Sequence, residues 1–277
     1  MRDFIYLAPA TLEEAIAMKK EHGDRAVFMA GATDIVIRLR DRLIAPDYVI
    51  DIKNIPGLGG VTFSESTGLH IGALATVYEI AADENVKRYY PFLAEAADSI
   101  GSKQVRNRAT CIGNIVNASP LADTATPLYC CDAVVEIAGP DGKREVPIRN
   151  FILFVRKVDL KEGELVTGIR VPYIRDAKAV FRKVSRRGEV DLSTVCGTVL
   201  KTGNEYRVSM GSVAPTPLRL DKTEALLSGK QLTPELIEQA AALAATEVKP
   251  IDDVRADKQY RLDIVSYIVR DALNQLQ

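Results

Sequence analysis

The chain has 277 residues, of which 47% are hydrophobic and 26% are charged, and its 36 Lys and Arg residues nearly balance its 37 Asp and Glu residues. The formal net charge is -1, so no basic excess points to nucleic acid or to an anionic membrane surface as a partner. The composition is ordinary for a globular protein, and the length allows two domains with a sizeable core.

The first residues do not resemble a targeting sequence. Acidic residues follow Arg2 closely, and no long apolar stretch comes after it as a secretory signal requires. No apolar run approaches the roughly 18 residues that a membrane-spanning helix needs. We therefore expect a soluble, cytoplasmic protein with no membrane partner.

The first part of the chain alternates between helical and strand-like patterns. Thr11, with Glu14 three positions later, forms a capping-box pattern, and the helix that it opens is predicted to end at Gly23. The next elements in chain order are a buried strand at 26–30, a helix at 33–43, a strand at 47–52 and, as the first candidate boundary, the Gly- and Pro-rich segment 55–60.

A second block of elements runs from Val61 to Tyr173. Its clearest feature is a hairpin predicted to turn at Asp141 and Gly142. In chain order the patterns predict a strand at 68–73, a helix at 76–83, a helix at 91–100, a helix at 124–133, the hairpin at 134–148 and a strand at 164–173.

Beyond Tyr173 the order of elements changes. Three strand-like runs with short polar links, FRKVSRR, LSTVCGTVL and EYRVSMGSV, predict an antiparallel meander. Three helical segments then follow, beginning at Lys222, Pro234 and Lys258. A sheet followed by helices predicts a separate α+β domain at residues 176–277.

Two similar turns interrupt apolar runs, in FMAGATDIVI at 28–37 and in TCIGNIVNAS at 110–119. A strand that stops at a small-residue turn before a helix presents unpaired backbone amides, which attract phosphate. Polar side chains in and after the turns add hydrogen-bonding groups for phosphate or sugar: Thr33, Asp34, Thr110, Asn114 and Asp123. Facing turns would hold a pyrophosphate from both sides. However, AGATD has neither the glycine spacing of a Rossmann fingerprint nor that of a P-loop. A single turn of this kind more often only connects a strand to a helix and binds no ligand.

The cysteines show no pattern of ligands. Their positions are Cys111, Cys130, Cys131 and Cys196, which form no recognised ligand spacing. We interpret them as buried small hydrophobes and expect no metal or iron–sulfur cluster held by this chain alone. His22 and His70 are isolated, and we assign them no chemistry.

The two turns and their flanks resemble the FAD-binding medium subunit of the molybdenum hydroxylases, the xanthine dehydrogenase and carbon monoxide dehydrogenase family. In that family the first loop usually reads A-G-G-T-D-L, and the second reads T-I-G-G-N and is followed by A-S-P-x-x-D. This chain has AGATDI and RNRATCIGNIVNASPLADTATP in the same order. The resemblance covers nearly the whole chain, through FIYLAPATLEEA, DIKNI, GLHIGALAT, VPY, FRKVSRR and DKQYRLDIVSYIVRDAL.

The resemblance implies an α+β fold with two parts. A two-lobed FAD-binding domain of the vanillyl-alcohol-oxidase type would span residues 1–175, with lobes at about 1–54 and 55–175. A small α+β domain, a three-stranded antiparallel sheet plus helices, would span 176–277. The implied activity is that of an oxidoreductase subunit. In such a complex the molybdopterin-containing large subunit gives electrons to a small subunit with [2Fe-2S] clusters. The FAD takes electrons from these clusters and passes them to NAD or another acceptor.

The resemblance also implies which residues hold the FAD, and it implies no catalytic side chain. The first loop would consist of Phe28, Met29, Ala30, Gly31, Ala32, Thr33, Asp34 and Ile35, and the second of Thr110, Cys111, Ile112, Gly113 and Asn114. Asp123 would hold the ribityl or adenosine side, and Val166 would pack an apolar side chain near the FAD. Lys183, or Arg182 beside it, would place a cation near the flavin and act electrostatically.

Several of these residues have structural alternatives. Asp34 is equally typical of a helix N-cap, and Asp123 could also be the N-cap of the helix at 124–133, although its family position favours the cofactor. Lys183 also fits the solvated face of a strand, and the strip that it forms with Arg182, Arg186 and Arg187 also fits a surface that docks a partner. Tyr260 and Arg261 match a late Y-R pair in the family, which we interpret as structural.

The chain departs from the family pattern at two loop positions. Ala32 replaces a glycine in the first loop, which costs about 1 kcal/mol or more if its φ is positive. Ile112 stands where the second loop usually has a glycine, and a β-branched residue disfavours positive φ. A structural homologue without cofactor remains open on the ground of Ile112 alone. A stand-alone flavin reductase on the same FAD fold also remains open, independently of these departures.

Overall fold

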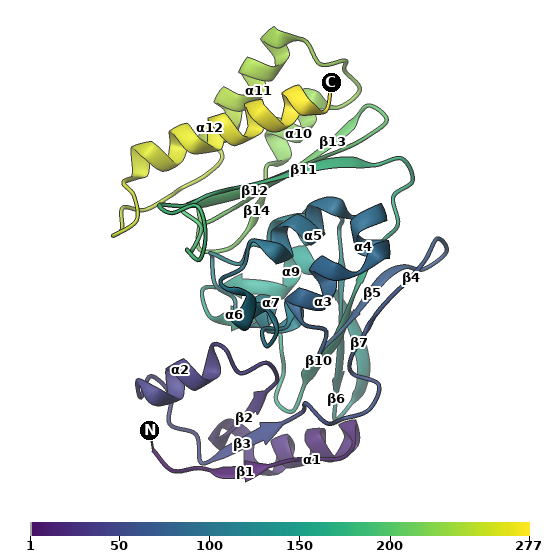
Figure 1. Cartoon of the computed structure of the whole chain (residues 1–277), viewed down its shortest axis with the longest axis vertical. Helices are drawn as coiled ribbons and strands as arrows, with labels where there is room; N and C mark the ends of the chain where they lie inside the picture. Colours follow the sequence, from purple (N-terminus) through teal and green to yellow (C-terminus); the bar gives the residue numbers. More distant parts are fainter. Residues whose placement is uncertain (1) are drawn as a thin grey trace.

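The computed structural model describes residues 2–277, which form three units stacked along the long axis of the molecule (Figure 1). The N-terminal lobe lies at one end, a larger second lobe lies in the middle, and a C-terminal domain lies at the other end. The two ends of the chain are therefore far apart. This arrangement of mixed helices and sheets confirms the predicted α+β class.

The N-terminal lobe is a three-stranded parallel sheet in the order β1-β3-β2. Its elements are β1 (Ile5–Leu7), α1 (Leu12–His22), the 3-10 turn η1 (Gly23–Arg25), β2 (Ala26–Met29), α2 (Ile35–Arg40) and β3 (Tyr48–Asp51). Thr11 caps α1 by accepting a hydrogen bond from the Glu14 amide at 3.2 Å, and Gly23 ends the helix with a φ of 53°. Both helix signals thus act as the sequence predicts.

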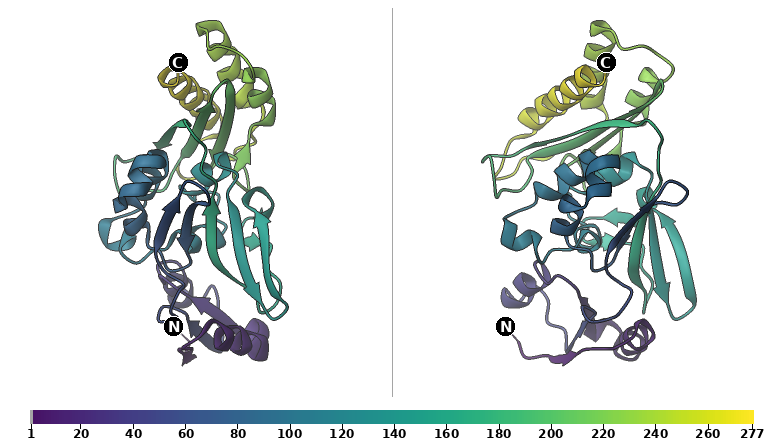
Figure 2. Two further views of the ribbon diagram at one scale, coloured as in Figure 1. Left: turned by 90° about the vertical axis from the view of Figure 1, so that its right-hand side faces the viewer. Right: turned by 45° about the vertical axis from the view of Figure 1, so that its right-hand side comes forward.

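The second lobe is a five-stranded antiparallel sheet in the order β4-β5-β10-β6-β7, and helices cover one of its faces (Figure 2). Its strands are β4 (Val61–Ser64), β5 (Gly68–Gly72), β6 (Val134–Gly139), β7 (Gly142–Pro147) and β10 (Leu165–Val171). Its helices are α3 (Val77–Ala82), α4 (Glu84–Tyr89), α5 (Pro91–Asp98), α6 (Lys103–Arg106), α7 (Cys111–Val116), α8 (Ala125–Cys130) and α9 (Ile148–Phe151). A small hairpin, β8 (Ile152–Phe154) with β9 (Lys157–Val158), completes the lobe.

A helix start and a hairpin that the sequence of this lobe predicts are both present in the structure. Thr76 and Glu79 form a complete capping box at the start of α3. In the β6–β7 hairpin Gly139 pairs with Gly142, so the turn residues are Pro140 and Asp141, one position earlier than predicted. Gly142 follows the turn with a φ of 109°, which a glycine adopts without steric cost.

The C-terminal domain has a four-stranded antiparallel sheet in the order β11-β12-β13-β14. Its elements are β11 (Lys178–Val184), β12 (Val195–Thr202), β13 (Glu205–Gly211), β14 (Leu218–Arg219), α10 (Asp221–Leu227), α11 (Pro234–Thr246) and α12 (Lys258–Gln275). The sequence predicted only three strands. The short β14 was missed because its two residues follow a Pro-rich segment that reads as a loop, and only the pairing with β13 makes them a strand.

This sheet is covered on both faces (Figure 1). Helix α12 packs on one face, and helices α5 and α8 of the second lobe pack against the other. Buried hydrogen bonds cross the second contact, since the hydroxyls of Thr126 and Thr198 lie 3.0 Å apart and the Cys130 thiol donates to the Thr198 carbonyl at 3.2 Å. The C-terminal domain is therefore joined to the second lobe by a packed interface.

Candidate functional site

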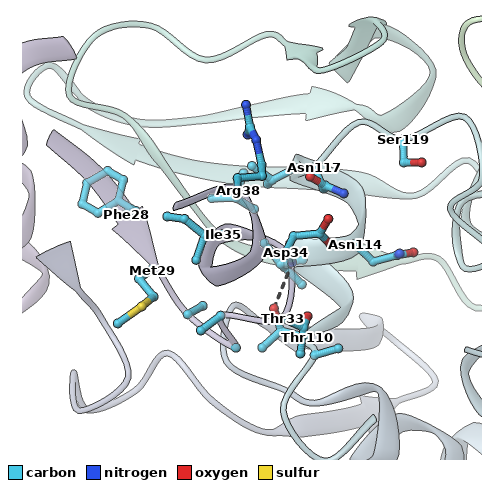
Figure 3. A pocket seen from close by; sticks show the side chains of 18 of the residues that line it. Phe28, Met29, Thr33, Asp34, Ile35, Arg38, Thr110, Asn114, Asn117 and Ser119 are labelled. Atoms are coloured by element: carbon cyan, nitrogen blue, oxygen red, sulfur yellow. Dashed lines mark hydrogen bonds between the residues drawn. The ribbon is translucent and has the colours of Figure 1, made fainter. Parts of the chain in front are cut away.

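A cleft of about 860 Å³ lies between the N-terminal lobe and the second lobe (Figure 3). Leu192 and Arg255, from two loops of the C-terminal domain, also line it. Its size is typical of a site for a large organic ligand. Most of the residues that the sequence singled out line it: Phe28, Met29, Ala30, Gly31, Ala32, Thr33, Asp34, Ile35, Thr110, Ile112, Gly113, Asn114 and Val166. The two turns, about eighty residues apart in sequence, thus meet at one cleft.

The backbones of the two turns are in direct contact at Gly31. A Cβ atom on this residue would lie 2.0 Å from the carbonyl oxygen of Arg108 and 3.1 Å from the Cα atom of Ala109. Gly31 does not have a positive φ, so the requirement for glycine here comes from space and not from backbone conformation. The close approach of the two loops depends on the missing side chain.

The two departures from the family pattern have different outcomes. Ala32 adopts a φ of 68°, in the left-handed region that costs a residue with a Cβ atom about 1–2 kcal/mol. Ile112 lies inside helix α7 without a positive φ, and its side chain is 5% exposed in the core of the second lobe. Backbone strain is therefore found at Ala32 and not at Ile112.

Backbone amides of the first turn are free to bind an anion. Within residues 2–277, the amides of Gly31, Ala32, Thr33 and Asp34 donate to no protein acceptor. Successive unpaired amides in a turn form a nest that suits a phosphate oxygen. The cleft wall formed by the first turn is thus rich in hydrogen-bond donors.

The second turn adds side-chain donors. The Thr110 hydroxyl oxygen accepts a hydrogen bond from the Gly113 amide at 2.9 Å and so caps α7, while its own hydrogen is still free to donate. The Thr124 hydroxyl donates to Asn114 Oδ1 at 2.6 Å, which leaves the Asn114 amide group as a donor. Each side chain is held in place by a protein contact that does not consume its donor.

Asp34 does not act as a helix cap. It occupies the N-cap position of α2, but its side chain accepts no capping hydrogen bond and is 54% exposed. Its carboxylate lies 3.8 Å from the guanidinium of Arg156. The capping alternative for this residue is therefore wrong.

Asp123 and Lys183 form an ion pair with each other, outside the lining of the cleft. Lys183 Nζ lies 2.7 Å from Asp123 Oδ2 and also donates to the Ser99 carbonyl at 2.8 Å, and the Ser193 hydroxyl donates to the other carboxylate oxygen of Asp123. Burial raises the pKa of the Asp123 carboxyl, while the Lys183 ammonium acts in the opposite direction. Asp123 is not the N-cap of α8, whose N-cap is Thr124, and Lys183 is not on a solvated face, since its side chain is 12% exposed. Their contact with a cofactor stays a prediction.

Cys111 also lies outside the lining of the cleft, and its contact with a cofactor stays a prediction too. The four cysteines are all free and buried, as the sequence predicted. Burial raises the pKa of the Cys111 thiol to about 12, which makes it an unreactive core residue at neutral pH.

The predicted basic strip, which runs from β11 into the residues that follow it, is largely paired within the chain. Arg182 Nε lies 2.7 Å from Asp271 Oδ2, and Arg186 and Arg187 lie 3.8 Å and 3.6 Å from Asp191 Oδ2. Docking of a partner on this strip stays a prediction. Arg261 is buried and donates to the carbonyls of Thr194 and Ser212 at 2.5 Å and 3.1 Å, which is a structural role.

The isolated histidines have packing partners outside the cleft. The ring of His22 stacks on Tyr48 with centroids 3.8 Å apart, and His70 Nε2 lies 3.0 Å from Glu136 Oε2. Neither residue lines the cleft.

The sequence did not identify several residues that line the cleft. They include Arg38, Asn117, Ser119, Arg156, Leu192 and Arg255. Arg38 follows the first turn by one helical turn, and Asn117 and Ser119 belong to the quoted second segment, so helical spacing could have identified them. Arg156, Leu192 and Arg255 come from distant loops that no local pattern connects to the turns.

Among residues 2–277, no helix is both long and apolar enough to cross a membrane.

Two family descriptions cover almost the whole chain. Residues 2–174 match the FAD binding domain in molybdopterin dehydrogenase, and residues 179–276 match the CO dehydrogenase flavoprotein C-terminal domain. The chain is 33% identical to the carbon monoxide dehydrogenase medium chain of Hydrogenophaga pseudoflava, over 98% of this chain and 96% of that one. It is 31% identical to the glyceraldehyde dehydrogenase medium chain of Sulfolobus acidocaldarius, over 99% of this chain and 98% of that one.

Solved structures show the same similarity. Carbon monoxide dehydrogenase from Hydrogenophaga pseudoflava superposes with a TM-score of 0.94 at 33% identity, over 99% of this chain and 96% of the other. Reconstituted CO dehydrogenase from Oligotropha carboxidovorans superposes with a TM-score of 0.93 at 26% identity, over 98% and 96% of the two chains. The similarity to both structures extends over nearly the whole of this chain.

Proposed function

Because the chain belongs to the family of FAD-binding medium subunits of molybdopterin-type dehydrogenases, we propose that it is the electron-transfer subunit of a multi-subunit molybdenum hydroxylase. In this role it takes electrons from [2Fe-2S] clusters on a small partner subunit. The small subunit in turn accepts electrons from a molybdopterin-containing large subunit, where substrate is oxidised. The electrons leave to NAD or to another acceptor.

The residues of the cleft fit an FAD. Gly31 lets the two turns approach, the amides of residues 31–34 and the Thr110 hydroxyl offer donors to a diphosphate, and Val166 contributes an apolar wall. When bound, FAD supplies the redox chemistry, and the chain's own residues bind it, orient it and exclude water. The meeting of both turns at one cleft is the observation that carries this proposal.

The cysteines of the chain support the electron-transfer role. They are buried and form no cluster-ligand pattern, so an iron–sulfur relay would be located on another chain. We also propose a cytoplasmic location, because four free cysteines are typical of a reducing compartment.

The cofactor is tested with the purified chain. We expect a visible flavin absorbance spectrum, and FAD as the flavin released on denaturation. A colourless protein that cannot be reconstituted with FAD would overturn the proposed function.

The place in a complex is tested by affinity purification of the tagged chain from its native host. We expect one large subunit that contains molybdopterin and one small subunit that contains iron. Substrate of the large subunit should then bleach the flavin absorbance, and NAD or another acceptor should restore it. Recovery of the chain alone as a competent reductase would favour the stand-alone alternative.

A further inference from the structure

Arg261 is a charged side chain that is buried in the C-terminal domain. It lies near the start of α12 and is 2% exposed. Its guanidinium donates to the carbonyl oxygens of Thr194 and Ser212 at 2.5 Å and 3.1 Å and to Asp253 Oδ1 at 2.6 Å. A buried charge is stable only where it is paired and hydrogen-bonded. The three acceptors belong to three different segments of the chain, so Arg261 fixes these segments relative to one another.

Two of the three segments supply residues to the cleft. Asp253 belongs to a turn in which its Oδ1 atom also accepts a hydrogen bond from the backbone amide of Arg255 at 2.8 Å, and Arg255 lines the cleft. Thr194 follows Leu192, which lines the cleft as well. Leu192 and Arg255, which the C-terminal domain contributes to the cleft, thus each lie two residues from an acceptor of Arg261.

The third segment, at Ser212, connects Arg261 to the second lobe. The Ser212 amide donates to the Pro120 carbonyl at 2.8 Å, and Ser119 and Leu121, on either side of Pro120, line the cleft. Ser212 has a φ of 65° and is 7% exposed. A residue with a Cβ atom keeps this conformation only where its surroundings fix it. Through one buried residue, Arg261 therefore also holds the chain that follows the second turn.

A second buried arginine of the same domain lacks a connection to the cleft. Arg219 has a side chain that is 5% exposed. It donates to the Tyr129 carbonyl at 3.0 Å and pairs with Asp132 and Glu224 at 2.8 Å and 2.5 Å. None of these four residues lines the cleft. The two arginines therefore separate an effect on general stability from an effect on the shape of the cleft.

We propose that Arg261 is a positioning residue that fixes the cleft wall for FAD, and this inference rests on the FAD-binding function proposed above. It holds the loops of Leu192 and Arg255 and, through Ser212, the chain that follows the second turn. Arg261 itself does not line the cleft, so it acts only through these segments. A wall that is already ordered loses little side-chain and loop freedom when a ligand binds, and this preserves affinity.

The test compares Arg261→Gln with the control Arg219→Gln. Each substitution leaves a carboxylate and a backbone carbonyl without their guanidinium partner, so both should lower the Tm of the FAD-free protein. Each FAD-free protein is titrated with FAD at a temperature at which it is folded. Amide hydrogen exchange of the same proteins shows which segments open more often.

We expect Arg261→Gln to raise the Kd for FAD about 10-fold, because the loosened wall must then be ordered on binding. Amide exchange should become faster in the segments 117–121, 190–194 and 253–256. Arg261→Lys, whose single ammonium cannot reproduce the contacts of a planar fork, should lie between wild type and Arg261→Gln. Arg219→Gln should keep the Kd of wild type and its exchange rates in these three segments.

A second variant, Asp253→Ala, decides the question if Arg261→Gln does not fold. It releases the turn at 253–256 but leaves the two carbonyl contacts of Arg261 in place. We expect faster exchange confined to that turn and a Kd for FAD that is about threefold higher.

An equal rise in the Kd for FAD in Arg261→Gln and Arg219→Gln would overturn the inference, because the effect would then be one of general stability. An unchanged Kd in a folded Arg261→Gln protein, or in Asp253→Ala where Arg261→Gln does not fold, would overturn it as well. If wild type itself binds no FAD, the proposed function fails instead. The exchange comparison alone then decides whether Arg261 fixes the three segments.

Discussion

Replacement of Gly31 by alanine tests the contact between the two turns most directly. The added Cβ atom would lie 2.0 Å from the Arg108 carbonyl oxygen, whereas ordinary contacts begin at 3.4 Å. The two loop backbones must therefore separate by about 1 Å, since neither atom is on a flexible side chain. Overpacking of this kind costs about 1–3 kcal/mol of folding free energy.

The same displacement should weaken cofactor binding. Donors of the first turn and of Thr110 would no longer reach one diphosphate together, so we expect the Kd for FAD to rise about 10-fold or more. Urea unfolding of the FAD-free protein measures the first effect, and FAD titration measures the second.

The matched control is Gly59→Ala. A Cβ atom at Gly59 would lie 3.9 Å from Leu74 Cβ, which is ordinary contact, and Gly59 does not have a positive φ. We expect a change of less than about 0.5 kcal/mol and an unchanged Kd. If Gly31→Ala behaves like this control in both assays, the described contact between the turns is refuted.

Three further changes address strain and charge. Ala32→Gly should raise the free energy of unfolding by about 1 kcal/mol by relieving the φ of 68°, and a loss of stability in urea would contradict this. Hydrogen bonds from Arg144 lower the pKa of Glu164, so its stabilisation is complete above its ordinary pKa of 4.5 and is lost as the pH falls through the lowered value. Glu164→Gln should therefore cost about 1–3 kcal/mol at pH 7, and its deficit against wild type should shrink in unfolding experiments below about pH 4. Asp123→Asn leaves the ammonium of Lys183 buried without its counter-charge and should cost about 3–5 kcal/mol, whereas adding Lys183→Met should restore much of the loss.

Local patterns in the sequence predicted most elements because each depends on neighbouring residues. The capping signals at Thr11 and Thr76 start helices, and alternating apolar residues form strands where expected. Strand β14 and the one-residue shift of the β6–β7 turn were not predicted from the sequence. Both depend on hydrogen-bonded pairing with another strand, which local sequence patterns do not show.

For the site, the sequence by itself determined the two turns, their small residues and their family resemblance. Only the tertiary structure decided that Gly31 touches the backbone of Arg108, and that Ala32 and not Ile112 carries strain. Turns and caps follow from interactions between residues a few positions apart. Contacts across a cleft join distant segments, and so they depend on how the lobes pack.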